Sequence, residues 1–230
     1  MIAMTTKCIV EHLEENWANE NYLAPISVIS SPDRDSAEIE ESTGTAPALP
    51  LVDSEIRILD FDKITRALYP KDHPTSADGI FLTRNSKGKI NKLYLVEFKG
   101  GFFNKTPKET AEYKKRRKSE TDQLLDSIKS KAVHSYVTLE KQMLTRCADS
   151  SHRINLYFMV VIDSSGDDAY NESGTVDSVK SALKHFNLKK DGEGNDYYYN
   201  EIMVKTANSF KKFLKANEIV QYPLEPPHNL

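Results

Sequence analysis

The sequence contains little cysteine and no long hydrophobic run, and both absences narrow the class of protein. Cys8 and Cys147 are the only cysteines in 230 residues, too few for a disulfide framework or a four-cysteine zinc site. No stretch approaches about 18 consecutive apolar residues, so we expect no transmembrane helix. Residues 1–7 lack a basic region followed by an apolar run, which argues against a secretory signal. These absences predict a cytoplasmic protein with no membrane association.

Several common catalytic signatures are also missing. The sequence has no GxSxG nucleophile elbow and no GxxxxGK[ST] phosphate-binding loop, so neither that class of hydrolase nor ATP use is indicated. The six histidines are not spaced like metal ligands. The remaining candidates for chemistry are carboxylates and basic side chains.

Charge is distributed unevenly along the chain, although the formal net charge is only −3. Residues 1–62 carry 13 acidic and three basic side chains, which leaves 21 acidic and 28 basic side chains in the remainder. A near-neutral total can therefore conceal a basic surface able to bind a polyanion. The alternative is that these charges only solvate the surface.

The hydrophobic pattern predicts one α/β domain over residues 1–222, with a C-terminal tail at 223–230. Residues 30–50 are rich in Ser, Pro and acidic residues, and we expect a long loop there. The alternation of Ile56 and Ile58 leaves a strand open as an alternative to the helix expected at 54–68. Expected helices are 7–20, 54–68, 121–145, 175–188 and 207–216, and expected strands are 26–29, 77–84, 92–99, 154–162 and 197–205.

The strand expected at 92–99 ends in two charged residues. Because side chains alternate along a strand, Glu97 and Lys99 share a face with the apolar Leu93 and Leu95. A charged pair at the end of an apolar strand is costly to bury unless it is paired, binds a metal ion or reaches a solvent-filled cleft. If the preceding strand pairs with this one as a hairpin, Asp78 approaches Glu97.

Two carboxylates and a lysine at one sheet edge have a known chemical use. Acidic oxygens hold a hard divalent cation, preferably Mg²⁺ or Mn²⁺, which polarises a phosphodiester and lowers the pKa of a bound water. Lys99 could orient that water and stabilise the charge that develops on the phosphate.

This pattern resembles the PD-(D/E)xK nuclease superfamily, the restriction-endonuclease-like phosphodiesterases. The resemblance rests on Asp78, 18 intervening residues, and Glu97-Phe98-Lys99 at the end of LYLVEFK, and it covers roughly residues 55–165. It implies a core of order αβββαβ, a mixed sheet flanked by helices, with Asp78 and Glu97 as metal ligands. It also implies the main-chain carbonyl of Phe98 as a third ligand. Ala77 stands where the motif's name has proline.

The superfamily often adds a further acid from the first helix. Glu55 is our preferred candidate for this catalytic position, with Asp62 one heptad later and Glu11 and Glu14 as alternatives.

An acid-x-Lys triplet alone is a weak signal, because chance produces a few in a chain of this composition. Glu112-Tyr-Lys114 is a second example. Only Glu97-Phe98-Lys99 ends an apolar strand and has an in-phase Asp on the preceding one. The alternative interpretation is a surface ion pair between Glu97 and Lys99.

A basic cluster follows the motif. Residues 105–131 hold nine basic side chains against five acidic ones, and the densest group includes Lys114, Lys115, Arg116 and Arg117. Such a cluster suits a phosphate backbone, although it could also be the solvated start of a long helix.

We therefore predict a Mg²⁺- or Mn²⁺-dependent nuclease acting on DNA, with RNA as a further substrate to test. The alternative is a non-catalytic module that kept a nuclease-like fold and binds nucleic acid or protein. A homodimer is left open.

Overall fold

A mixed sheet of seven strands lies at the centre of the computed structural model, which describes residues 6–31, 49–100, 111–144, 154–163, 169–185 and 198–222. The strand order is β1-β2-β3-β4-β5-β6, with β7 paired to β3. The pairs β1–β2, β2–β3 and β3–β4 are antiparallel, whereas the pairs β4–β5 and β5–β6 are parallel. The strands are β1 (Leu23–Pro25), β2 (Arg57–Asp60), β3 (Gly79–Arg84), β4 (Ile90–Lys99), β5 (Asn155–Ile162), β6 (Glu201–Thr206) and β7 (Glu218–Ile219). The α/β class with a mixed sheet is therefore confirmed.

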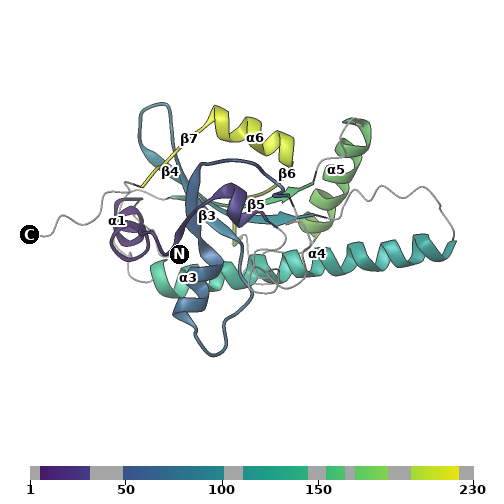
Figure 1. The fold of residues 1–230 in the computed structure, drawn as a ribbon, viewed down its shortest axis with the longest axis horizontal. Coiled ribbons are helices and arrows are strands. Elements are labelled where there is room, and N and C mark those ends of the chain that lie inside the picture. Colours follow the sequence, from purple (N-terminus) through teal and green to yellow (C-terminus); the bar gives the residue numbers. More distant parts are fainter. Residues whose placement is uncertain are drawn as a thin grey trace, which may run out of the picture.

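Helices cover both faces of this sheet (Figure 1). One face packs against α1, α3, α4 and α5, and the opposite face packs against α2 and α6. The helices are α1 (Thr6–Asn16), α2 (Ile26–Ile29), α3 (Phe61–Leu68), α4 (Ala111–Leu139), α5 (Ala169–His185) and α6 (Ala207–Ala216), and a π-helical turn, η2 (Glu140–Leu144), extends α4. None of the helices in the described ranges is long and apolar enough to cross a bilayer.

Side-chain alternation on β4 distributes its residues between two cores. Leu93 and Leu95 pack in the core beneath α4, whereas Tyr94 and Val96 pack in the core beneath α6. Its neighbour β5 is also buried on both faces, as its continuous apolar sequence predicts. The strands that carry the candidate site are therefore held between two packed layers.

The strand predicted at 26–29 is wrong, because these residues form the helical turn α2. The amide of Ser30 donates to the carbonyl of Ile26 at 2.8 Å, and Ile26 and Ile29, three residues apart, are both buried. The strand lies just before this turn, at Leu23–Pro25. Four residues are too few for periodicity to distinguish a helical turn from a strand.

The helix predicted at 54–68 is correct only in its second half. Residues 57–60 form β2, whose Ile58 and Leu59 point to opposite faces of the sheet and join opposite cores. Helix α3 then begins after Asp60, whose carboxylate caps it by accepting a hydrogen bond from the amide of Lys63 at 2.9 Å. As a result, the order α2-β2-α3-β3-β4-α4-β5 contains one helix, α3, more than the expected αβββαβ.

The long helix α4 begins at Ala111 rather than at the predicted 121. Its first ten residues carry no apolar stripe, but they are rich in Glu, Lys and Arg, which favour helix. Figure 1 shows this part of α4 extending beyond the sheet. Most of the loop predicted at 30–50 and the whole tail 223–230 lie outside the described residues.

Candidate active site

The β3–β4 pairing places Asp78 opposite Glu97. Gly79 pairs with Val96 across antiparallel strands, and the amide of Asp78 donates to the carbonyl of Val96 at 2.9 Å. The Asp78 carboxylate then accepts a hydrogen bond, at Oδ2, from the amide of Phe98 at 2.7 Å. The predicted antiparallel pairing of these two strands is thus confirmed, and it fixes Asp78 against the end of β4.

Gly79 permits a close approach of strands next to Asp78. A Cβ atom at this position would lie 2.6 Å from Cδ1 of Ile58 and 3.2 Å from Cγ1 of Val96. Both distances are shorter than ordinary van der Waals contact, so the side chains of Ile58 and Val96 would have to shift to admit any larger residue. Gly79 therefore allows these two side chains to pack closely over β3, next to Asp78.

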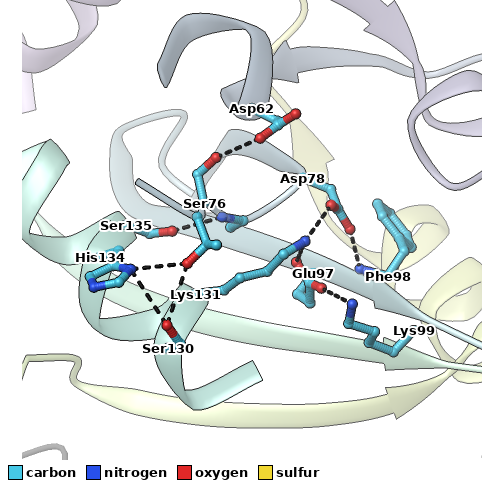
Figure 2. A network of polar contacts seen from close by, with 12 residues as sticks. Asp62, Ser76, Asp78, Glu97, Phe98, Lys99, Ser130, Lys131, His134 and Ser135 are labelled. Carbon is cyan, nitrogen blue, oxygen red and sulfur yellow. Dashed lines mark hydrogen bonds and ion pairs between the residues drawn. The ribbon is translucent and has the colours of Figure 1, made fainter. Parts of the chain in front are cut away.

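Lys131 of α4 bridges the two carboxylates (Figure 2). Its Nζ lies 3.1 Å from Oδ1 of Asp78 and 2.9 Å from Oε2 of Glu97. Because both distances share one nitrogen, the two oxygens are no more than 6.0 Å apart. The Nζ of Lys99 lies 3.1 Å from the other Glu97 oxygen, Oε1. We call these four residues the carboxylate–lysine cluster.

Helix α4 is fixed to the chain that enters β3. Ser135 Oγ accepts a hydrogen bond from the amide of Ala77 at 2.7 Å, and Nδ1 of His134 lies 2.9 Å from Oγ1 of Thr75. Ser135 is one helical turn beyond Lys131, so the first of these contacts sets the position of the lysine relative to Asp78.

Sequence reasoning missed the role of Lys131, which it counted only as one member of a basic segment. The available signal was its place on the helix, three residues after Ile128 and beside Ala132, both of which are buried. A lysine on the apolar side of a helix requires a buried acidic partner.

Burial differs among the four charged groups. Glu97 is completely buried, whereas the side chains of Asp78, Lys99 and Lys131 remain 16%, 21% and 20% exposed. Three of the four groups can therefore meet solvent or a ligand, and Glu97 lies behind them.

The electrostatics of the cluster favour the protonated form of Glu97. Burial, and after it the charge of Asp78, raise the pKa of Glu97 to about 8 against the opposing effect of Lys131 and Lys99. For Lys131, burial alone would lower the pKa, but Glu97 and Asp78 together hold it above its ordinary value. Lys131 thus stays protonated while Glu97 takes up a proton more readily than an exposed glutamate would.

A cavity of about 520 Å³ opens beside the cluster. Asp78, Lys99 and Lys131 line it, together with Arg66, His73 and Thr75 from the segments around α3. The cavity therefore places two carboxylates, of Asp78 and Asp62, and several basic groups around a space large enough for a small polar ligand or part of a chain.

The donor set fits one hard divalent cation. Glu97 Oε1 is buried and, although it is within ion-pair distance of Lys99, it receives no hydrogen bond from the described residues. Within the same ranges, no group of three or more Asp, Glu, His or Cys side chains converges, so the remaining ligands would be main-chain oxygen and water. The Phe98 ring packs against Phe210 on the other face, which leaves its backbone at the site. Ligation by the Phe98 carbonyl stays a prediction.

The candidates for a further acid occupy different places. Asp62 on α3 lines the cavity, where it contacts Arg66 at 2.8 Å and accepts a hydrogen bond from Ser76. Glu55 is exposed and precedes β2, so the expectation that it shares a helix with Asp62 is wrong. Glu11 and Glu14 are exposed on α1.

The predicted nucleic-acid contacts lie on the first turns of α4. The backbone of Lys114, Lys115, Arg116 and Arg117 is helical, and their side chains lie outside the described part of the chain. Their contact with phosphate stays a prediction.

Comparison with known proteins returns no relative, since no family model, no curated protein and no solved structure matches the chain. The sequence and the structure agree on a hairpin that brings Asp78 next to Glu97 and Lys99, and the structure adds Lys131 from the following helix. The function is therefore inferred from the chemistry of these side chains.

Proposed function

We propose that this protein is a phosphodiesterase that hydrolyses DNA with the help of Mg²⁺ or Mn²⁺. One observation carries the proposal: Asp78, Glu97 and Lys99 converge from two paired strands beside a cavity. Acidic oxygens and an ammonium group in one site are the groups that metal-dependent phosphodiester hydrolysis requires.

Asp78 and Glu97 are the residues that would hold the cation. Each keeps one oxygen within about 3 Å of the same point, now taken by the Lys131 ammonium. The amide of Phe98 orients the Asp78 carboxylate, and burial fixes Glu97. A bound Mg²⁺ or Mn²⁺ would polarise the scissile phosphodiester and lower the pKa of a bound water.

Lys99 is placed to act on the attacking water and on the phosphate. Its ammonium is 3.1 Å from Glu97, and its side chain also lines the cavity. It can therefore orient a water by hydrogen bonding and stabilise negative charge that develops on a phosphate oxygen.

The surrounding fold supports a restriction-endonuclease-like core, which we include in the proposal. A β3–β4 hairpin carries the acidic residues, α4 follows it, and β5 returns parallel to β4. The additional helix α3 between β2 and β3 is a departure from αβββαβ, and it supplies Asp62 and Arg66 to the cavity.

Basic groups near the site favour a polyanionic substrate. Arg66, Lys99 and Lys131 line the cavity, and the basic cluster 114–117 lies on the same helix as Lys131. Positive charge spread along a helix suits the regularly spaced phosphates of a nucleic acid better than it suits a single small anion.

The alternative is a binding module in which the cluster only stabilises the fold. The bridging contact of Lys131 favours this alternative, because two ionised acids and two lysines balance in charge without a metal ion. Under this alternative the protein would bind nucleic acid or another protein and hydrolyse nothing.

A comparison of DNA hydrolysis by the wild-type protein and by Lys99→Ala tests the proposal. We expect wild-type protein with Mn²⁺ or Mg²⁺ to cleave DNA and Lys99→Ala to lose a hundredfold or more in rate, about what a positioned acid–base or electrostatic group contributes. Lys92→Ala is a matched control, since Lys92 lies on the same strand but stacks over Tyr157 away from the site. Supercoiled, linear and single-stranded DNA and structured RNA serve as substrates, and circular dichroism verifies folding.

Two results would count against the proposal. Undiminished hydrolysis by Lys99→Ala would mean that another site or a contaminant is responsible. Absence of cleavage by wild-type protein that still binds DNA would favour the binding module. Mn²⁺ calorimetry on Asp78→Asn, which keeps an oxygen for the Phe98 amide but loses the charge, locates the metal separately from activity.

A further inference from the structure

We propose that Lys131 is an internal cation that competes with the divalent metal ion for Asp78 and Glu97, and that the metal displaces it into the cavity, where it binds substrate phosphate. This inference rests on the proposed function and deepens it. The observation that motivates it is that one ammonium contacts both carboxylates, at 3.1 and 2.9 Å.

Geometry makes the two cations mutually exclusive. A metal ion held by the same two oxygens would occupy the space that the ammonium now fills. Two like charges that close repel strongly in a buried site. Lys131 must therefore leave one or both carboxylates when a metal ion binds.

Charge balance points in the same direction. With both carboxylates ionised, the charges of Asp78, Glu97, Lys99 and Lys131 sum to zero, so adding a divalent cation creates a surplus of two positive charges. A phosphodiester of the substrate removes part of that surplus. We therefore expect metal and nucleic acid to bind with positive cooperativity, each offsetting a charge that the other leaves unbalanced.

Lys131 has room to move. It lines the cavity and is 20% exposed, so a rotation of its four-carbon side chain can carry the ammonium toward a ligand. The helix beneath it stays fixed, because Ser135 binds the amide of Ala77 and both Ala132 and Ile128 are buried.

The test is Mn²⁺ calorimetry on Lys131→Met, with Lys131→Gln as a second variant that keeps a hydrogen-bond donor. We expect either variant to bind Mn²⁺ about tenfold more tightly or better than wild type, because the competing charge is gone. We also expect DNA binding in the presence of Mn²⁺ to weaken. Tighter Mn²⁺ binding together with weaker DNA binding distinguishes the proposal, since loss of a merely structural lysine would not tighten metal binding.

Lys129→Met is the matched control. Lys129 lies two residues earlier on α4, is equally exposed at 21%, and contacts Asp126 rather than the site, so its loss should leave Mn²⁺ affinity unchanged. If loss of Lys131 weakens the fold by leaving two acids unpaired, thermal unfolding gives a second readout. Mn²⁺ should then raise the melting temperature of Lys131→Met by more than that of wild type.

The outcomes separate the two proposals. Equal Mn²⁺ affinity in wild type and both Lys131 variants, with metal-dependent hydrolysis intact, overturns the displacement of Lys131 and leaves the proposed function standing. Weaker Mn²⁺ binding in the Lys131 variants also overturns it. Absence of Mn²⁺ binding in every protein, including Lys131→Met, overturns both proposals together.

Discussion

Replacing Glu97 with glutamine should change how stability depends on pH. Glu97 is completely buried, and burial together with the charge of Asp78 raises its pKa from an ordinary 4.5 to about 8. Glutamine has nearly the same shape and can still accept a hydrogen bond from Lys131, but it does not titrate. The comparison of the two proteins therefore isolates the effect on stability of the one proton that Glu97 binds.

The sign follows from the direction of the shift. A group whose folded-state pKa is raised favours folding when it is protonated, so the contribution is complete below pH 4.5 and is lost as the pH rises through about 8. The free energy of unfolding of the wild-type protein should fall relative to that of Glu97→Gln across this window. Above the window, the free energies of unfolding of the two proteins should change with pH in parallel.

The magnitude can be worked from the shift. One pKa unit corresponds to about 1.4 kcal/mol, so the whole shift corresponds to on the order of 5 kcal/mol. Within the window the difference between the two proteins should change by up to about 1.4 kcal/mol per pH unit. This is a large fraction of the stability of an ordinary domain.

Urea denaturation at intervals between pH 5 and pH 9, with a chelator present, measures both proteins. Groups distant from the cluster are the same in both proteins, so their contributions cancel from the difference. Lys131 does not contribute, because its pKa is held above its ordinary value and out of this range. Parallel curves for wild type and Glu97→Gln between pH 5 and pH 8 would refute the argument that burial and the charge of Asp78 raise the pKa of Glu97.

Two further predictions concern the backbone and the substrate. Gly79→Ala should lower the free energy of unfolding by about 1–3 kcal/mol, because its Cβ would meet Ile58 and Val96. Gly100→Ala is the control, because no atom of the described residues lies within 4 Å of an added Cβ there, and equal urea midpoints for the two variants would contradict the prediction. Replacing Lys114, Lys115, Arg116 and Arg117 with glutamine should flatten the dependence of DNA affinity on salt by up to about three to four units of logarithmic slope, and an unchanged slope would mean that these residues are only solvated.

The hairpin could be predicted because its signal is local. Alternation placed Asp78 in phase with Ile80, and Glu97 in phase with Leu95, so pairing the strands was enough to bring the acids together. Side-chain alternation over several residues is kept in the structure because the two sets of side chains pack into two different cores, one on each face of the sheet.

The rest depends on contacts between distant segments. Lys131 reaches Asp78 and Glu97 only because α4 crosses the hairpin at a register set by Ser135 and Ala77, and no local pattern contains that register. The division of residues 54–68 into β2 and α3 likewise follows from burial of Ile58 and Leu59 in opposite cores. Tertiary packing overrides weak local preference in such short segments.

With DNA as the proposed substrate, helix α4 would also set the distance between two places of phosphate contact. Arg117 precedes Lys131 by 14 residues on this one continuous helix, which corresponds to about 21 Å along its axis. Duplex DNA advances about 3.4 Å for each base pair, so about six base pairs separate a phosphate at the cluster from one at the basic start of the helix. A duplex shorter than this could occupy only one of the two places, and a longer one could occupy both. Affinity plotted against oligonucleotide length should therefore rise in a step rather than smoothly.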